Sequence, residues 1–348
     1  MTPTTRVPRA RAIASRVEAW FDETRRELPW RRDYDPFHVW VAEVMAQQTR
    51  MEVILPFFEK FIARFPDLEQ LAAAEEREVL ALWSGLGYYR RARMLHAGAR
   101  QVATGGLPSS VEELSRIPGI GRYTAGAIAS IAFNRREPVV DGNVIRLSAR
   151  LEAMNEPQGS GSLSRWQWEW AGALVAACES PRRLNQGLME LGAMICRPRN
   201  PRCAECPLSR FCKARKEGNP EAYPLKSQSR PEVAMTIPLF LAIDEKGRVL
   251  LRQARGRIAR EMFHLPHGSM EILGTDDSMR FTTRERVGSF RHSITHRRIE
   301  FDLWRCNVRE TIAEDDGDLE WIDPTALDRL PHPSYVRKAL KLAGVAMI

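Results

Sequence analysis

Four cysteines within a short stretch near residue 200 constrain this chain more than any other feature of its sequence. They lie in CRPRNPRCAECPLSRFC, where six, two and five residues separate successive cysteines. In a cytoplasmic protein, such spacing indicates metal or cluster ligation rather than disulfides. Thiolates suit both zinc and a cubane iron–sulfur cluster, so spacing alone leaves both open. The four predicted ligands are Cys196, Cys203, Cys206 and Cys212.

Length and charge limit what kind of protein this is. A chain of 348 residues fits two domains of common size, and 44% hydrophobic with 28% charged residues is typical of a folded protein. We expect no membrane-spanning segment and no secretion signal, and therefore a cytoplasmic location. The net charge of +8 favours a polyanionic partner, although a solvated basic surface would have the same charge.

The chain divides into a helical part and a second part rich in β-formers. Apolar residues at three- and four-residue spacing predict an all-α domain over residues 1–213. Residues 214–232 are polar, contain Pro and Gly, and are predicted to be a linker. Within residues 233–348, strand candidates predict a smaller α+β domain. These candidates are Thr236–Ile243, Arg248–Arg252 and Ile299–Cys306.

LSRIPGIGRYTAGAIAS contains a tight turn followed by a helix. Gly119 and Gly121 flank the turn, and their backbone N–H groups can receive a phosphate at the start of that helix. A plain connection between two helices would carry the same glycines. Asp141 follows in PVVDGNVIRL, where it could cap a helix or lie in an Asp-Gly turn.

LPWRRDYDPFHVWVAEVMAQQTR predicts a helix with an acid at the edge of an apolar face. Asp35 and Pro36 supply an N-cap and a first-turn proline, so residues 37–48 should be helical. Glu43 lies at the edge of the apolar face, where partial burial favours the protonated carboxyl that a general acid needs. A surface ion pair is the alternative interpretation of Glu43.

Together these motifs resemble the helix-hairpin-helix superfamily that contains endonuclease III and the MutY-type adenine DNA glycosylases. The resemblance implies an all-α helix-hairpin-helix glycosylase domain whose cysteine loop, residues 196–212, holds a 4Fe-4S cluster. It also implies that a smaller α+β Nudix-like domain follows. The sequence lacks the glutamate run of a Nudix hydrolase, so the second domain is expected to bind and not to hydrolyse.

The resemblance assigns catalytic roles. Glu43 would protonate N7 of adenine, and Asp141, with Asn143 of the same loop, would face the cation that develops on the sugar. Tyr123 stands where lyases of this superfamily carry the lysine that forms a Schiff base. This tyrosine in place of the lysine implies a monofunctional enzyme, in which Tyr123 helps to position Asp141.

The resemblance also assigns contacts to the base and the DNA. Trp30 and Arg31 would line the adenine pocket, and Gln186 would make a further contact to the base. Gln48 would fill the space that the extruded base leaves in the stack. Tyr88 would contact DNA as well, with a packed aromatic as its alternative.

In the second domain, Thr295 and His296 stand where the family has a Ser-His pair, which implies recognition of 8-oxoguanine. Two ordinary polar loop residues are the alternative. The expected activity is excision of adenine opposite 8-oxoguanine or guanine by base flipping and hydrolysis of the N-glycosidic bond, in base excision repair. The expected partner is duplex DNA, and the expected state is a monomer in the bacterial cytoplasm, associated with the nucleoid. The alternatives are an endonuclease III-like or thymine-mismatch glycosylase and a catalytically silent DNA-binding module.

Overall fold

The chain forms two compact units, and each is continuous in space but not in sequence. The first consists of Met1–Gln48, Asp67–Glu69 and Ala97–Gln228, and the second of Thr49–Pro66, Gln70–His96 and Ser229–Ile348. A single division at residues 214–232 was predicted, whereas several helices of the N-terminal half group with the C-terminal strands. The computed structural model describes residues 7–226, 232–254, 261–269, 276–294, 297–309 and 318–347.

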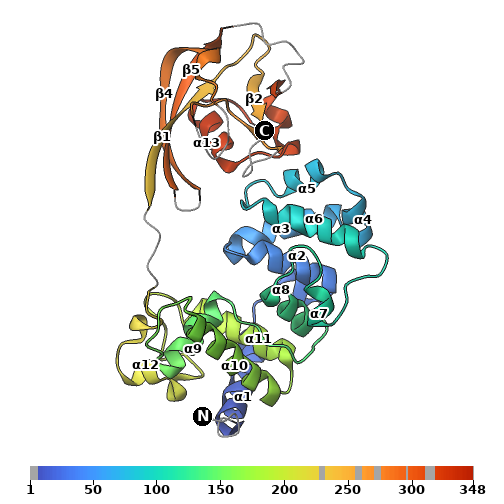
Figure 1. The fold of residues 1–348 in the computed structure, drawn as a ribbon, viewed down its shortest axis with the longest axis vertical. Helices are drawn as coiled ribbons and strands as arrows, with labels where there is room; N and C mark the ends of the chain where they lie inside the picture. Colours follow the sequence, from blue (N-terminus) through green and yellow to red (C-terminus); the bar gives the residue numbers. More distant parts are fainter. Residues whose placement is uncertain are drawn as a thin grey trace. The chain divides into compact units, whose positions relative to one another are not determined.

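The first unit is helical, as predicted. Helix α1 packs against α10 and α11 (Figure 1). Their apolar side chains form one core with those of α9. The helices are α1 (Val7–Thr24), α2 (Pro36–Ala46), α7 (Val111–Leu114), α8 (Arg122–Ala127), α9 (Gly142–Glu152), α10 (Gly161–Ala177) and α11 (Pro181–Glu190). The shorter turns are η2 (Pro29–Arg31), η3 (Ile128–Ala132), η4 (Leu191–Ile195) and η5 (Ser209–Phe211).

Helices α8 and α11 both continue into a π-helical turn, η3 and η4, and a glycine in each allows a close approach. A Cβ on Gly126 would lie 2.6 Å from the carbonyl oxygen of Pro138. A Cβ on Gly192 would lie 2.5 Å from the Cβ of Asn143. Only glycine fits where two backbones meet so closely. The segment from residue 138 to residue 143 is therefore held between the two helices.

The linker prediction was wrong for residues 214–226. This stretch folds onto the first unit as α12 (Lys213–Lys216) and η6 (Pro220–Ala222), and Leu225 forms a β-bridge with Pro157. Ala214 is fully buried, and the carbonyl of Tyr223 accepts a hydrogen bond from Arg150. This polar stretch is thus held by contacts of its backbone groups together with the buried Ala214.

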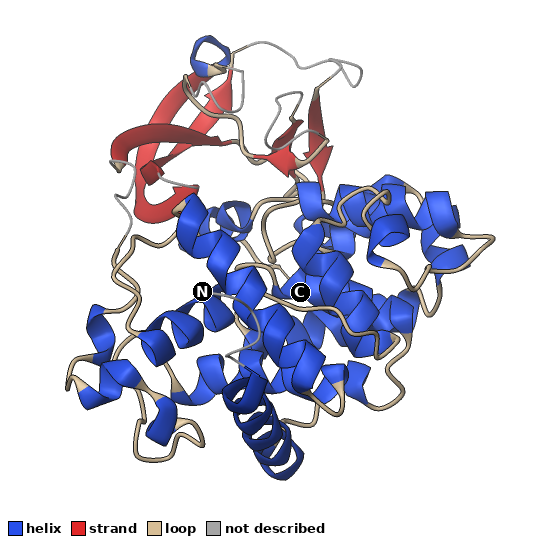
Figure 2. Cartoon of the chain, turned by 60° about the horizontal axis from the view of Figure 1, so that its bottom comes forward, coloured by secondary structure: helices blue, strands red, loops and turns tan. Residues whose placement is uncertain are grey.

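The second unit combines helices with two three-stranded sheets, and it contains all the named strands (Figure 2). One sheet has the order β1-β5-β4, with β1 parallel and β4 antiparallel to β5, and the other has the order β3-β2-β6. The strands are β1 (Val233–Leu241), β2 (Val249–Gln253), β3 (Phe263–His264), β4 (Phe281–Ile294), β5 (Arg297–Val308) and β6 (Leu319–Ile322). The helices are α3 (Met51–Arg64), α4 (Leu68–Ala73), α5 (Glu76–Leu82), α6 (Arg90–Val102) and α13 (Ser334–Leu342), with η7 (Ser278–Arg280) and η8 (Pro324–Arg329); α4 and α6 extend into the first unit.

The three predicted strands are confirmed as β1, β2 and β5, with small shifts at their ends. Strand β4 was not predicted, because residues 282–286 in its first half are all exposed and alternate burial begins only at Gly288. It is held by its antiparallel pairing with β5, in which Phe290 lies opposite Phe301. Among the described residues, no helix is long and apolar enough to cross a membrane.

Candidate active site

Glu43 is buried at the centre of α2, so the surface ion pair considered for it is not formed. The cap of this helix is as predicted: the Asp35 carboxylate accepts hydrogen bonds from the backbone N–H groups of Phe37 and His38. Only 7% of Glu43 is exposed, and its Oε2 accepts a hydrogen bond of 2.6 Å from the Tyr123 hydroxyl. Burial raises the pKa of Glu43 to about 7, against the lowering effects of the Tyr123 hydroxyl and of Arg31. Glu43 can therefore hold or release a proton near neutral pH.

Tyr123 has a different partner from the predicted one. It lies in the first turn of α8, and its hydroxyl donates to Glu43 rather than to Asp141. Burial raises the pKa of Tyr123 well above its ordinary value, and the nearby negative charges of Glu43 and Asp141 raise it further. Tyr123 is thus a neutral hydrogen-bond donor that lies close to both acids.

Asp141 caps α9 and still keeps acceptor capacity on one oxygen. Its Oδ1 accepts from the backbone N–H groups of Asn143 (3.0 Å) and Val144 (2.8 Å), and its Oδ2 accepts from the Asn143 side-chain amide (2.8 Å). Burial raises the pKa of Asp141, and these hydrogen bonds oppose the effect by favouring the anion. The cap fixes the carboxylate in place, so capping does not exclude a catalytic role.

Arg146, which the sequence did not single out, connects the Asp141 loop to the cysteine loop. Its Nη2 donates to the Oδ1 of Asn143 (2.9 Å) and to the carbonyl of Gly192 (2.7 Å), and its Nε donates to the carbonyl of Cys196 (2.7 Å). The side-chain amide of Asn143 is oriented by this contact, so that its N–H points to Asp141. The only sequence signal was an arginine on the same helix face as Asn143, three residues later.

A second network surrounds Arg31. Trp30 is buried in η2, and the next residue, Arg31, donates from Nε to the Oε1 of Gln186 (2.8 Å) and from Nη1 to the Oε1 of Glu190 (2.8 Å). Glu190 is 2% exposed and also accepts from Arg26 (2.8 Å). Three predicted site residues are thus brought together with a buried acid that the sequence analysis missed.

The predicted DNA contacts are more exposed. Gln48 follows the end of α2, is exposed, and has a left-handed backbone with φ of 58°. Gly119, with φ of 81°, and Gly121 lie in the turn between α7 and α8, where Gly121 is the N-cap of α8. In the second unit, Tyr88 is 51% exposed, so its side chain is not the packed aromatic that was considered. Thr295 and His296 lie outside the described residues.

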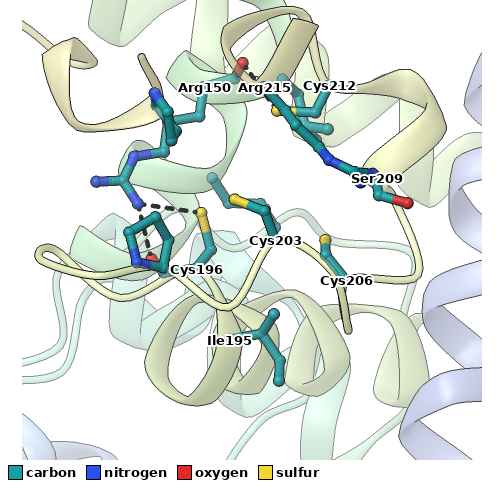
Figure 3. Close-up of a pocket in the computed structure, with 12 residues that line it drawn as sticks. Arg150, Ile195, Cys196, Cys203, Cys206, Ser209, Cys212 and Arg215 are labelled. Carbon is teal, nitrogen blue, oxygen red and sulfur yellow. Dashed lines mark hydrogen bonds between the residues drawn. The ribbon is translucent and has the colours of Figure 1, made fainter. Parts of the chain in front are cut away.

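The four predicted cysteine ligands line one cavity in the first unit. Figure 3 shows their sulfur atoms directed toward a common space, together with Ile195 and Arg215. In the part of the chain that the structure describes, no three His, Cys, Asp or Glu side chains are grouped as a site for a single metal ion. Four thiols that line one cavity can hold zinc or an iron–sulfur cluster.

The charge around this cavity also fits an anionic cluster. Arg150 is 2% exposed, and its Nη1 lies 3.4 Å from the Cys196 sulfur and 2.7 Å from the carbonyl of Arg197. Its other described partners are the carbonyls of Cys196, Pro198 and Tyr223. None of these partners is a carboxylate. A buried cation needs a compensating negative charge, and four thiolates around a cluster supply one.

Comparison with known proteins agrees with this architecture. Residues 41–171 match the HhH-GPD superfamily of base excision DNA repair proteins, 196–212 match the iron–sulfur binding domain of endonuclease III, and 239–342 match the NUDIX domain. The adenine DNA glycosylase of Buchnera aphidicola subsp. Acyrthosiphon pisum is 32% identical over 286 residues, which cover 80% of this chain and 81% of that protein. The chain belongs to the adenine DNA glycosylase family. The predicted fold class and 4Fe-4S cofactor are thereby confirmed.

Other members of the adenine DNA glycosylase family are longer. The mouse protein is 42% identical over 215 residues, which cover 58% of this chain and 42% of the mouse protein, so the chain spans less than half the length of that relative. The solved structure of a thermostable thymine-DNA glycosylase covers 61% of this chain at 27% identity, with a TM-score of 0.53. A trapped covalent complex of endonuclease III with DNA, at 21% identity and a TM-score of 0.50, shares the fold.

Proposed function

We propose that this protein is a monofunctional adenine DNA glycosylase, which removes adenine paired with 8-oxoguanine or guanine from duplex DNA. The observation that carries the proposal is the buried Glu43, whose pKa is about 7 and which is hydrogen-bonded to Tyr123 close to Asp141. A general acid works best when its pKa lies near the working pH, and raised pKa values of buried acids are typical of active sites.

The proposed reaction begins with a proton transfer. Glu43 donates its proton to N7 of the flipped adenine, which makes the base a neutral leaving group when the N-glycosidic bond breaks. The sugar becomes an oxocarbenium-like cation, which the fixed carboxylate of Asp141 stabilises. A water molecule then adds to the anomeric carbon, and its proton returns to Glu43. Asn143 and Arg146 contribute by holding the Asp141 carboxylate in place.

Recognition of adenine is assigned to the network around Arg31. Arg31 holds the carbonyl oxygen of the Gln186 side chain, so the amide of Gln186 has one fixed orientation. Glu190 in turn holds Arg31 and Arg26 on a single carboxylate oxygen. Fixed polar groups discriminate between bases because a wrong base leaves them without partners. Trp30, buried next to Arg31, supplies the apolar wall of the same pocket.

DNA binding is assigned to the exposed residues of both units. The turn with Gly119 and Gly121 would receive a backbone phosphate, and Gln48 would enter the base stack. The cationic loop 196–212 would face the phosphate backbone, and the 4Fe-4S cluster would stabilise the conformation of this loop. Tyr88 would stack on a base, and Thr295 with His296 would recognise 8-oxoguanine. We assign the protein as a monomer in the bacterial cytoplasm, associated with the nucleoid.

A single-turnover assay tests this proposal against its alternatives. Base release is measured on duplexes with adenine opposite 8-oxoguanine, adenine opposite guanine, and thymine opposite guanine. We expect release from the two adenine substrates and no strand cleavage without added alkali, because Tyr123 cannot form a Schiff base. Release of thymine alone would favour the thymine-mismatch alternative, and strand cleavage with borohydride trapping would favour the endonuclease III-like one. Binding without any base release would favour the silent module.

A further inference from the structure

The loop that presents Tyr88 is unusually constrained for an exposed loop. This Tyr88 loop, residues 83–89, joins α5 to α6. Gly85, Gly87 and Tyr88 all have left-handed backbones, with φ of 113°, 70° and 49°. A tyrosine in this region is strained, and such a conformation persists only where its surroundings determine it. The loop therefore needs contacts that hold it in place.

Part of the support comes from Arg91, at the start of α6. Its guanidinium lies 5.4 Å from the centre of the Tyr88 ring and 5.7 Å from that of Trp83. It also donates to the carbonyls of Leu86 (3.4 Å) and Gly87 (3.3 Å). The cation thus contacts one side of the Tyr88 ring, and half of the side chain is left exposed.

The rest of the support comes from a segment that is distant in sequence. We call residues 330–337 the C-terminal bracket. Both backbone groups of His332 in this bracket bind side chains of the Tyr88 loop: the His332 carbonyl accepts from the Tyr89 hydroxyl (2.8 Å), and the His332 N–H donates to the Ser84 hydroxyl oxygen (3.2 Å). Tyr89, next to Tyr88, is buried.

The side chain of His332 is fixed as well. Its Nε2 accepts a hydrogen bond from Arg337 (2.8 Å), so the proton of the neutral ring is on Nδ1, which lies 2.7 Å from the carbonyl of Leu330 and donates to it. His332 is 1% exposed. The bracket is therefore a rigid support for the loop.

The same bracket packs against the β4–β5 sheet. Tyr335 stacks on Phe301 of β5, with ring centres 4.6 Å apart, and its ring centre lies 5.6 Å from that of His292 in β4. His292 is three residues before Thr295, so this contact lies close in sequence to Thr295 and His296. One short segment thus holds both the Tyr88 loop and the hairpin formed by β4 and β5.

We propose that Tyr89 and Ser84, by binding His332, position Tyr88 relative to the β4–β5 hairpin and thereby determine the preference for 8-oxoguanine. This inference rests on the proposed function, in which Tyr88 contacts DNA and Thr295 with His296 recognises 8-oxoguanine. Two contacts held in one rigid body bind together at lower entropic cost than two that move independently. The lower entropic cost favours binding of the substrate that uses both contacts, which is the duplex with 8-oxoguanine.

Removal of one hydroxyl group tests the inference. Tyr89→Phe keeps the ring and loses the hydrogen bond to His332, together with the long one (3.5 Å) that the hydroxyl accepts from the Gly85 N–H within the Tyr88 loop. We expect the ratio of single-turnover rates, adenine opposite 8-oxoguanine over adenine opposite guanine, to fall about threefold to tenfold, the effect of one buried hydrogen bond. Ser84→Ala, which removes the acceptor for the His332 N–H, should lower the ratio in the same direction. The rate opposite guanine should stay close to that of the wild type.

Tyr335→Phe is the matched control. Its hydroxyl is buried and makes no hydrogen bond among the described residues, so its loss should leave the ratio unchanged. In a Tyr88→Ala background, Tyr89→Phe should have no further effect on the ratio, because its role is exerted through Tyr88.

Three results would overturn the inference: an unchanged ratio in Tyr89→Phe, equal slowing on both substrates with a lower melting temperature, or effects of Tyr88→Ala and Tyr89→Phe that add. A wild-type chain that releases no adenine from either duplex would overturn the proposed function together with this inference. If the wild type releases adenine and Tyr89→Phe keeps the wild-type ratio of rates on the two duplexes, this inference alone is overturned.

Discussion

Two regions of the molecule bury charged groups, and they differ in how the charge is compensated. In the first unit, Glu43 and Asp141 are two acids close to one another, and burial raises the pKa of both. In the second unit, the Asp277 carboxylate is bound by Arg252 through both oxygens and is 2% exposed. The first region therefore holds an acid, Glu43, that can exchange a proton near neutral pH beside a second acid, and the other region holds a neutralised ion pair.

The histidines of the second region support the same distinction. His264 and His267 are fully buried, and each places Nδ1 against a backbone carbonyl, of Leu265 and Gly268. Burial lowers the pKa of His264 to about 3 and also lowers that of His267, so both rings are neutral at physiological pH. Burial of ionisable groups alone does not identify an active site. An acid such as Glu43, without a full counter-charge and with a pKa near neutrality, identifies an active site better.

The largest expected effect comes from replacing Glu43, the proton donor of the first region. Glu43→Gln keeps the size of the side chain but cannot supply a proton to adenine. Loss of a general acid typically costs about 10²- to 10⁴-fold in rate. We expect this fall in single-turnover adenine release, while the affinity for duplex DNA, measured by fluorescence anisotropy, stays within about twofold because no phosphate contact is lost. A rate near that of the wild type would remove Glu43 from the mechanism.

In the second region, the expected loss is of stability and not of chemistry. Asp277→Asn leaves the Arg252 guanidinium buried without its main counter-charge, which should cost about 3 to 5 kcal/mol in the free energy of unfolding. Urea denaturation followed by circular dichroism measures the change. The rate of adenine release opposite guanine, per folded molecule, should remain close to wild type. A lower rate without a loss of stability would mean that the two regions do not differ as described.

Much of the helical site follows from local sequence signals. The Asp35-Pro36 pair predicts the start of α2, which places Glu43 in its apolar middle, and the cysteine spacing predicts the loop that encloses one cavity. These signals are read within one helix or one loop. The partner of Tyr123 was predicted wrongly because Glu43 is 80 residues away in sequence, and only the packing of α2 and α8 brings the two together.

Other parts of the site gave no local signal. Arg146 and Glu190 lie in helices whose pattern explains them as ordinary charged residues, and their roles depend on tertiary partners 46 and 159 residues away. Residues 214–226 have the composition of a linker, but the Tyr223 carbonyl accepts a hydrogen bond from the distant Arg150 side chain and Leu225 forms a β-bridge with Pro157. In strand β4, residues 282–286 are all exposed, so its alternation is confined to the second half of the strand.

A smaller effect concerns the pH dependence of stability. The pKa of Glu43 in the folded state, about 7, is above its ordinary value of 4.5, so the folded state holds the proton more tightly than the unfolded state. The stabilisation of the folded state by this more tightly held proton is fully present below pH 4.5 and is lost as pH rises through 7. Glu43→Gln cannot lose this contribution, so from pH 4.5 to 8 its stability relative to wild type should rise by up to roughly 3 kcal/mol. Chemical denaturation at both pH values measures it, and a pH-independent difference would contradict the raised pKa.

The smallest expected effect tests whether Tyr123 tunes the first region. The hydrogen bond from Tyr123 favours the Glu43 anion, so it lowers the pKa of Glu43 against the effect of burial. Tyr123→Phe removes the donor and should raise this pKa further. Because the protonated acid is the active form, the rate of adenine release should fall with rising pH above about 7 in the wild type. In Tyr123→Phe this descending limb should move to higher pH.

Single-turnover rates of the wild type and of Tyr123→Phe, measured from pH 6 to 9, give the descending limb of each protein. Tyr335→Phe is the control for loss of a buried tyrosine hydroxyl outside this region. A limb that moves to lower pH, or does not move while the rate falls at every pH, would mean that Tyr123 holds the geometry of Glu43 without setting its proton affinity.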